Sequence, residues 1–269
     1  NTFGKGRWVV FPSKAKDKTN FKSNADKLAT LVKDTPWCTK ELASSQLEGG
    51  DFYVFVDNKN KPHIAVRMSG DSIEEVRGIL NGGAQELEPE YRDVAIDFLQ
   101  NNKDIKNGKE WLAKEEWNKR LIDYKQQIES GQFKTKQVKD LIKDLTYGDF
   151  KSHGGRNSNK DALIAVLPQI SPLLCQYFGC SSNEICFGDY TEDAAECNYV
   201  IVLGNFKAAG SVLKNANKLK YIIGDADFDF SQVTNLSKLT TIGGDARFIG
   251  SEVTDLSNLT TIGGFADFR

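Results

Sequence analysis

The chain has 269 residues, of which 39% are hydrophobic and 27% charged, the composition of a globular protein with room for about two domains. Its 35 basic and 37 acidic residues are well mixed and leave a formal net charge of -2, which disfavours a dedicated nucleic-acid binder. No apolar run approaches the roughly 18 residues of a membrane span, and no signal-peptide core opens the chain, so we expect no membrane partner.

The cysteines predict a reducing compartment, because five of them are too few for a disulfide scaffold at this length. We therefore expect a cytoplasmic protein. The last four follow the spacing C-x4-C-x5-C-x10-C, which lacks the C-x2-C pair of common zinc sites. We interpret them as buried thiols of a small apolar subdomain and predict neither a metal nor a cofactor. These four are Cys175, Cys180, Cys186 and Cys197.

The N-terminal part predicts a small antiparallel sheet accompanied by helices. Residues 7–11 form an apolar run typical of a strand, and a helix follows with Ser23 or Asn24 as its cap. Two β-rich runs, 51–56 and 63–68, flank a polar loop and predict a hairpin. Residues 72–78 fit either a helical capping box or a third strand. We favour the strand, because the turn signal Asn81-Gly82-Gly83 follows at once.

The middle of the chain predicts helices. Pro89 opens one, residues 109–129 form a longer one, and Thr135 caps a third. A glycine-rich link at 152–158 lacks the sequence context of a phosphate loop. The helical pattern then resumes over 161–177, where we expect a break at Pro168 and Pro172, and residues 175–198 are expected to cap the region that follows.

The C-terminal region repeats a 20-residue unit, marked by Gly204, Gly224, Gly244 and Gly264. A fixed period of this kind is the signature of a solenoid, whose units bury their apolar faces by stacking. Apolar residues recur at steps of three and then at a step of two, which resembles leucine-rich and receptor L-domain repeats. We expect one parallel strand per coil, with two ladders. The first ladder joins Ala226, Ala246 and Ala266, and the second joins Phe228, Phe248 and Phe268.

The first and last units depart from this pattern. In the first, Lys207 and Ala208 replace the strand pattern and Ala216 replaces a leucine, as in a terminal capping repeat. After the last unit no polar cap follows Arg269, which would leave an open strand edge in water. We therefore expect that further repeats follow in the natural chain, or that a partner covers this end.

Together these signals predict an α+β protein in three parts. An α+β domain with a small antiparallel sheet occupies residues 1–102, a helical region occupies 103–198, and a leucine-rich-type β-solenoid occupies 199–269.

Cys38 and His63 are the candidate catalytic residues. Whether Thr35 or Thr39 caps the next helix, the sulfur of Cys38 lies near a helix N-terminus, which favours a thiolate. With His63 on a later strand, the chain contains the ingredients of a Cys–His nucleophile pair, in the order that transglutaminase- and papain-like enzymes also show. The alternative is that His63 is a solvent-facing strand residue.

Arg67 and Arg77 are the candidate anion-binding residues. If Ile64 and Val66 face the core, Arg67 lies on the other face of the sheet, where Arg77 of a neighbouring strand can join it. Two guanidinium groups could bind a phosphate or carboxylate. The alternative is that both are exposed arginines paired with Glu74 or Glu75.

A family resemblance follows from four motifs. They are Trp37-Cys38-Thr39, residues 49–55 (Gly-Gly-Asp-Phe-Tyr-Val-Phe), residues 64–68 (Ile-Ala-Val-Arg-Met) and Glu75-Val76-Arg77-Gly78. They resemble an uncharacterised domain of phage and mobile-element proteins, and distantly PcfJ-like proteins, and the repeats resemble arrays common in phage-encoded proteins. The resemblance implies a phage or mobile-element protein that acts in a bacterial cytoplasm or is packaged in a virion.

We predict that the solenoid binds a protein partner, since solenoids present an extended ordered face. The expected surface is mixed and mostly acidic, which suits a protein and disfavours nucleic acid. An alternative is an effector enzyme with Cys38 as nucleophile, delivered by the repeats. A further alternative is a virion or cargo component. The residues of the expected surface are Asp225, Asp227, Asp245, Arg247 and Asp267.

Overall fold

The computed structural model describes residues 6–79, 87–146, 158–191 and 194–269 and divides into two compact units, Asn1–Lys119 and Arg120–Arg269. The division differs from the expected boundaries at 102 and 198. It falls inside a long helix, α4 (Gly108–Glu129). The later helices belong to the same unit as the solenoid because they pack on it, as shown below. The turn expected at Asn81–Gly83 and the link at 152–157 lie outside the described residues.

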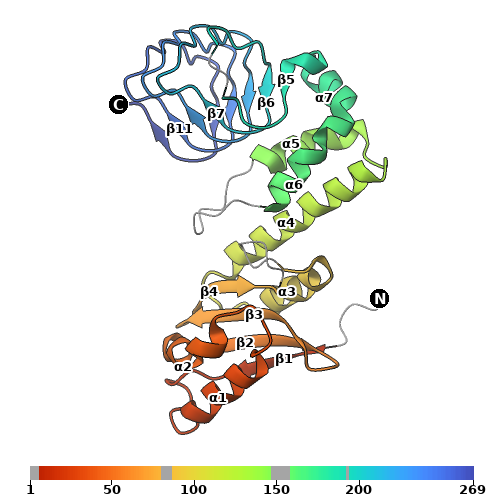
Figure 1. Cartoon of the computed structure of the whole chain (residues 1–269), viewed down its shortest axis with the longest axis vertical. Helices are drawn as coiled ribbons and strands as arrows, with labels where there is room; N and C mark the ends of the chain where they lie inside the picture. Colours follow the sequence, from red (N-terminus) through yellow and green to blue (C-terminus); the bar gives the residue numbers. More distant parts are fainter. Residues whose placement is uncertain (1–5, 80–86, 147–157, 192–193) are drawn as a thin grey trace. The chain divides into compact units, whose positions relative to one another are not determined.

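The N-terminal unit contains an antiparallel sheet in the order β1-β2-β3-β4 (Figure 1). Its β2–β3 hairpin was predicted from the apolar runs, and the strand interpretation of residues 72–77 is confirmed. Register shifts interrupt the β2–β3 pairing after Phe55 and the β3–β4 pairing after Arg67. The strands are β1 (Gly6–Phe11), β2 (Phe52–Asp57), β3 (Pro62–Ser69) and β4 (Ser72–Arg77).

Helices cover both faces of this sheet because side chains of a strand point alternately to its two faces. Val54 and its same-face neighbours pack against α1 (Phe21–Leu31) and α2 (Thr39–Gly49). Phe55 and its neighbours pack instead against α3 (Pro89–Asn101) and the start of α4. Helix α1 begins earlier than expected, with Asn20 before it and no capping hydrogen bond from that side chain, so neither Ser23 nor Asn24 is its cap.

A buried ion pair joins α3 to α4. A terminal guanidinium nitrogen of Arg92 lies 2.7 Å from Oε2 of Glu115, and both side chains are almost fully buried. The second terminal nitrogen donates to the carbonyl oxygen of Leu87 at 3.4 Å. Because a buried charge is costly without its partner, this pair fixes how the two helices pack.

Among the described residues of the C-terminal unit, helices α5, α6 and α7 lie between α4 and the solenoid. α5 (Val138–Thr146) follows the short helix η1 (Thr135–Gln137). The expected break at the two prolines is confirmed, because α6 (Ser158–Val166) and α7 (Ser171–Phe178) are separated by η2 (Leu167–Ile170). The ring of Phe178 contacts that of Tyr221 in the solenoid, with centroids 4.9 Å apart.

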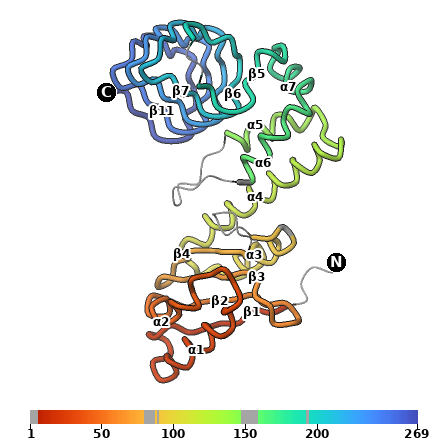
Figure 2. The backbone as a smooth tube through the Cα atoms, in the orientation of Figure 1, coloured from red at the N-terminus to blue at the C-terminus, as the bar shows by residue number. Residues whose placement is uncertain are grey.

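The solenoid carries two short parallel strands per coil instead of the one we expected (Figure 1). Figure 2 shows the backbone of its coils stacked one on another. The difference arises because the backbone turns at Gly224 and its equivalents, so each coil contributes to two sheets. The first sheet contains β5 (Ile185–Cys186), β6 (Ile201–Val202), β8 (Tyr221–Ile222), β10 (Thr241–Ile242) and β12 (Thr261–Ile262). The second contains β7 (Phe206–Lys207), β9 (Ala226–Asp227), β11 (Ala246–Arg247) and β13 (Ala266–Asp267).

Both expected ladders are present. Ala226, Ala246 and Ala266 pair in register, and the rings of Phe228 and Phe248 stack with centroids 5.2 Å apart. The same stacking continues to Phe268.

The first coil keeps its strand, contrary to our expectation, because large and small residues exchange places. Phe206 occupies the register of Ala226, and Ala208 donates its N–H to Asp227 one coil on. Both Phe206 and Ala208 are buried, so the exchange preserves the volume of the core. Ile185–Cys186 pairs with β6 in front of this coil, as expected of a cap.

Within the described residues, no helix combines the length and the apolar character that crossing a membrane requires.

We predict that Arg92→Met lowers the free energy of unfolding of the N-terminal unit by about 3–5 kcal/mol, because it leaves the buried carboxylate of Glu115 without its guanidinium partner. All four tryptophans lie in Asn1–Lys119, so urea unfolding followed by tryptophan fluorescence reports on this unit alone. The matched control is Lys106→Ala, which removes a pair whose side chains are 73% and 71% exposed. The control substitution should lower the free energy of unfolding by less than about 1 kcal/mol. Equal losses for the two variants would show that the Arg92 pair is not desolvated.

Candidate functional site

The structure places the two candidate catalytic residues on opposite faces of the sheet. Cys38 is exposed and is the cap residue of α2, which covers the face of Val54. The ring of His63 stacks on Tyr91 of α3, with centroids 3.9 Å apart, on the face of Phe55. Cys38 does lie at a helix N-terminus, as expected, but it is itself the cap residue, so neither Thr35 nor Thr39 caps α2. The Cys–His pair is not assembled.

His63 joins the hairpin to the start of α3. It is 5% exposed, so it is not the solvent-facing residue of our alternative interpretation. Its Nδ1 lies 2.8 Å from Oε2 of Glu88, and its Nε2 lies 3.3 Å from Oδ2 of Asp57. The backbone N–H of Lys61, and next the His63 ring, hold the pKa of Asp57 below its usual range. Burial, and next the charge of Glu88, raise the pKa of Tyr91.

One hydrogen bond brings two of the motifs together. Nε1 of the fully buried Trp37 donates to the carbonyl oxygen of Gly78 at 2.7 Å. The Trp-Cys-Thr segment therefore supports the end of the Glu-Val-Arg-Gly strand. This gives Trp37 a structural role in the core, and it leaves Cys38 at the surface beside that contact.

Arg67 and Arg77 do lie on one face, as predicted, but both guanidinium groups are paired with carboxylates. Arg67 lies directly opposite Glu75 in the β3–β4 register, and Glu75 contacts Arg67 and Arg77. Arg67 also approaches Glu74 at 3.0 Å. An external anion would have to compete with Glu75, so the ion-paired alternative describes the structure.

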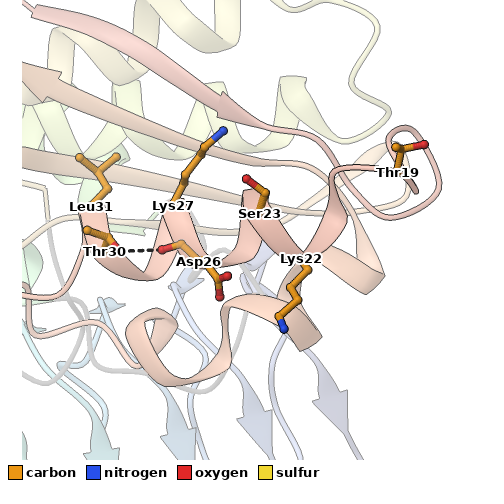
Figure 3. A pocket seen from close by; sticks show the side chains of 7 residues that line it. All are labelled: Thr19, Lys22, Ser23, Asp26, Lys27, Thr30 and Leu31. Atoms are coloured by element: carbon orange, nitrogen blue, oxygen red, sulfur yellow. Dashed lines mark hydrogen bonds between the residues drawn. The ribbon is translucent and has the colours of Figure 1, made fainter.

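A surface hollow runs along α1, on the side shown in Figure 3. Helix α1 and the turn before it supply the whole lining, and Oγ1 of Thr30 donates within the helix to the carbonyl oxygen of Asp26 at 2.7 Å. No candidate site residue contributes to it. The lining residues are Thr19, Lys22, Ser23, Asp26, Lys27, Thr30 and Leu31.

A ladder of side-chain acceptors, here named the acceptor ladder, connects successive coils of the solenoid. Oδ1 of Asp189 accepts the N–H of Asn205, whose own Oδ1 accepts the N–H of Asp225. Asp225 accepts in the same way from Asp245, and Asp245 accepts from Phe265. Two of the residues that we predicted to bind a partner, Asp225 and Asp245, thus have a structural role.

The acceptor ladder explains the repeated glycine. A Cβ on Gly244 would overlap Oδ1 of Asp225, and a Cβ on Gly264 would overlap Oδ1 of Asp245. The preceding glycines, Gly243 and Gly263, instead face the carbonyl oxygens of the previous coil and the end of α5 at Thr146. Glycine is therefore required by close approach of the coils.

The other candidate binding residues form a row of alternating charge, the charged row, on the second sheet. Lys207, Asp227, Arg247 and Asp267 lie side by side in the strand register. Lys207 pairs with Asp189 at 2.9 Å, and Arg269 donates to Asp267 and thereby lowers the pKa of that carboxyl group. These ion pairs lie within the solenoid, so the charged row is mixed in sign, and the exposed Asp225 and Asp245 of the acceptor ladder add acidic groups.

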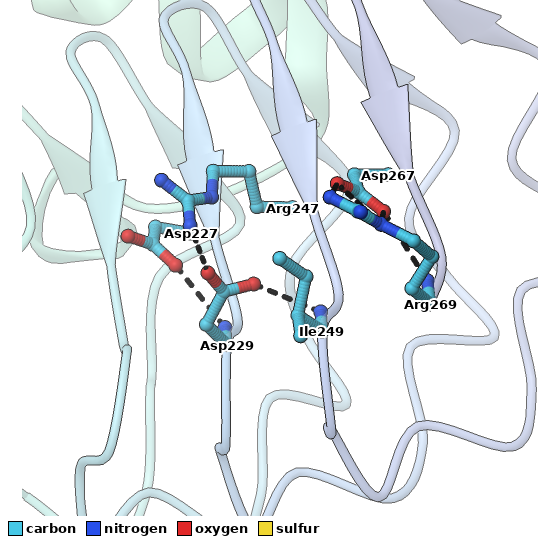
Figure 4. A network of polar contacts seen from close by, with 6 residues as sticks. All are labelled: Asp227, Asp229, Arg247, Ile249, Asp267 and Arg269. Carbon is cyan, nitrogen blue, oxygen red and sulfur yellow. Dashed lines mark hydrogen bonds and ion pairs between the residues drawn. The ribbon is translucent and has the colours of Figure 1, made fainter.

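Asp229, which the sequence did not single out, holds Arg247 in place (Figure 4). Asp229 is buried, and its Oδ2 lies 2.6 Å from a guanidinium nitrogen of Arg247. Its Oδ1 accepts the N–H of Ile249 at 2.8 Å. The side chain of Arg247 remains 54% exposed, so it is an oriented charge at the surface.

Phe230 has an unusual backbone conformation for an aromatic residue. Its φ is 54°, and the equivalent positions one coil before and after are Gly210 and Gly250, both with φ of 60°. A left-handed conformation costs a non-glycine residue about 1–2 kcal/mol. The residue is nevertheless 68% exposed. Its ring lies beside Gly250, where an added Cβ would come within 2.7 Å of Cδ1 of Phe230. Neither core packing nor backbone preference explains an aromatic residue here.

We name the surface formed by Phe230, Arg247 and Ile249 the Phe230 patch. Its members are adjacent, since Phe230 donates its N–H to the carbonyl oxygen of Ile249, and Arg247 and Ile249 share Asp229. The sequence held one usable signal for it, because Phe230 stands where the period places glycine in the neighbouring coils.

Comparison with protein-family models, curated proteins and solved structures gives no match to this chain. Within the described part of the chain, no group of three or more His, Cys, Asp or Glu side chains is arranged to hold a metal ion. The interpretation of the site therefore depends on its own geometry.

We predict that Asp225→Ala speeds amide hydrogen exchange at Asp245 and lowers the free energy of unfolding by about 1 kcal/mol, because the Asp245 N–H loses its acceptor. Asp225→Asn is the matched control. It should keep the exchange rate at Asp245 and the free energy of unfolding near their wild-type values, since Asn205 already serves as an acceptor in the ladder. Exchange followed by mass spectrometry and thermal unfolding followed by circular dichroism measure the two effects. An Asn variant as damaged as the Ala variant would show that the ladder depends on charge.

Proposed function

We propose that this chain is a recognition protein whose solenoid binds a protein partner through the Phe230 patch. The observation that supports the proposal is Phe230 itself, an exposed aromatic side chain kept in a left-handed backbone conformation. Backbone strain at an exposed residue points to function, because selection for stability alone would have favoured glycine there.

The chemistry of the patch suits a protein surface. Aromatic and arginine side chains contribute most to binding energy at protein interfaces. Arg247 is already oriented by Asp229, so less conformational entropy is lost when a partner contacts it. Ile249 adds partly exposed apolar area next to both.

The mixed charges support a protein partner rather than nucleic acid. Because the neighbouring charged row alternates in sign, it offers no continuous positive field for nucleic acid. A partner with an apolar pocket for Phe230 and an acidic or hydrogen-bond-accepting rim for Arg247 matches the patch.

The phage or mobile-element context, as well as the cytoplasmic or virion location, stays a prediction from the sequence motifs. The same holds for an effector enzyme that uses Cys38. Because His63 is engaged with Glu88 and Asp57, that alternative would need a different base.

We predict that Phe230→Gly weakens capture of the partner at least tenfold, while the free energy of unfolding stays unchanged or rises by about 1 kcal/mol, because glycine adopts the left-handed conformation without strain. The full chain and its variants are compared for the bands they retain from a lysate of the source cells, and thermal unfolding is measured in parallel. Arg247→Ala should weaken capture of the same bands.

The control is Lys238→Ala, an exposed substitution outside the patch that should leave capture unchanged. If Phe230→Gly lowers stability by more than about 1 kcal/mol and leaves capture intact, Phe230 is structural and the proposal is wrong.

A further inference from the structure

Two cysteines occupy the ends of the turn that closes α7. Gly179 has a left-handed backbone with φ of 65°, and its N–H donates to the carbonyl oxygen of Cys175 at 2.9 Å. The N–H of Cys180 donates to the same oxygen at 3.2 Å. These features define a Schellman-type helix end, in which the side chains of the first and last positions contact each other. Here those positions are Cys175 and Cys180.

The turn brings the two cysteines together, and both are accessible. Both side chains are partly exposed, and neither forms a disulfide in this structure. Burial, and next Cys175, raise the pKa of Cys180, so that its S–H remains protonated and can donate a hydrogen bond to the sulfur of Cys175.

We propose that Cys175 and Cys180 form a reversible, oxidant-dependent disulfide, with a peroxide as the oxidant. In the first step the thiolate of Cys175 attacks one oxygen of hydrogen peroxide, the O–O bond breaks, and the departing hydroxide takes up a proton to give water and a sulfenic acid. In the second step the sulfur of Cys180 attacks the sulfenyl sulfur. The S–O bond breaks, and hydroxide leaves with the Cys180 proton as a second water. Two thiols lose two electrons, which reduce one peroxide to two waters.

The position of the pair indicates what the bond would do. The turn leads from α7 through η3 (Ser182–Glu184) into β5, the strand that caps the first coil. Glu184 is held by Lys218 at 2.8 Å, and its carbonyl oxygen accepts the N–H of Val200. A covalent bond across the turn would therefore fix the joint between the helices and the solenoid.

The other three cysteines lie in different surroundings. Cys186 and Cys197 pack with the apolar core of the solenoid, and Cys38 is an exposed residue of the N-terminal unit. Their presence allows the experiment to measure selectivity within one molecule.

The test treats the full chain with hydrogen peroxide, removes the oxidant with catalase and alkylates the remaining thiols with N-ethylmaleimide under denaturing conditions. Trypsin leaves all four C-terminal cysteines in residues 161–207, and cleavage after Glu184 then separates Cys175 and Cys180 from Cys186 and Cys197. We expect fragment 161–184 to lack both alkyl groups and to weigh about 2 Da less than the dithiol form. Dithiothreitol should restore alkylation at both positions.

A second digestion locates the bond. Chymotrypsin cuts after Tyr177 or Phe178, between the two cysteines, so a disulfide keeps the two halves joined until it is reduced. Cys175→Ser is the matched control and should abolish the joined species. The oxidised wild-type protein should also unfold at a temperature a few degrees above the reduced one, whereas the Cys175→Ser variant should show no such shift.

Joined halves in the wild type, absent in the variant, support the proposal. Alkylation of both Cys175 and Cys180 at a peroxide dose that has already oxidised Cys38 overturns it. So does a disulfide that joins either residue to another cysteine, within the chain or between chains.

Discussion

Each coil of the solenoid stacks on a near copy of itself, so a side chain at any position must be compatible with the same position one coil away. Phenylalanine satisfies this constraint by parallel stacking of its ring, as Phe228 and Phe248 do. Carboxylates satisfy it by accepting the next coil's N–H, since a row of unpaired like charges would repel. The charged row satisfies it by alternating in sign. The glycine that marks the period is a consequence of the same stacking, because the acceptor of the previous coil occupies the space of its Cβ.

Departures from the repeat are informative for the same reason. Phe206 and Ala208 exchange the large and small positions of the first coil and so preserve the core, which is a compensated change. Phe230 has no such compensation. It replaces a glycine, adopts a left-handed backbone and exposes most of its ring. Within a self-stacking array, an uncompensated departure must be explained by something outside the array, and this is why the proposed binding surface is centred on Phe230.

The sequence predicted the features that depend on local pattern. The antiparallel sheet follows from alternation along strands of six to eight residues, and the coil ladders follow from the period. It did not predict two strands per coil, because strands of two residues, such as β9, are too short to produce an alternation.

The candidate site was less predictable from the sequence than the fold. Arg67 and Arg77 were placed on one face correctly, but the sheet separates Cys38 from His63. The register shift between Phe55 and Val56 leaves His63 out of the strand pairing, between Ile64 and Pro62, so alternation along the strand does not give its face. The partner of His63, Glu88, lies far along the chain and follows from no local pattern.

The repeat period also separates structural acidic residues from binding residues, which composition alone cannot do. Asp225 and Asp245 are exposed, and exposed carboxylates on a solenoid suggest recognition. Yet one carboxylate oxygen of each residue accepts a backbone N–H of the next coil. A partner that drew the carboxylate away from the solenoid would leave that N–H without its acceptor. Arg247 is different, because Asp229 orients its guanidinium group while more than half of the side chain stays in solvent. A partner can therefore contact Arg247 without disturbing the contacts between coils, and the same is true of the exposed ring of Phe230.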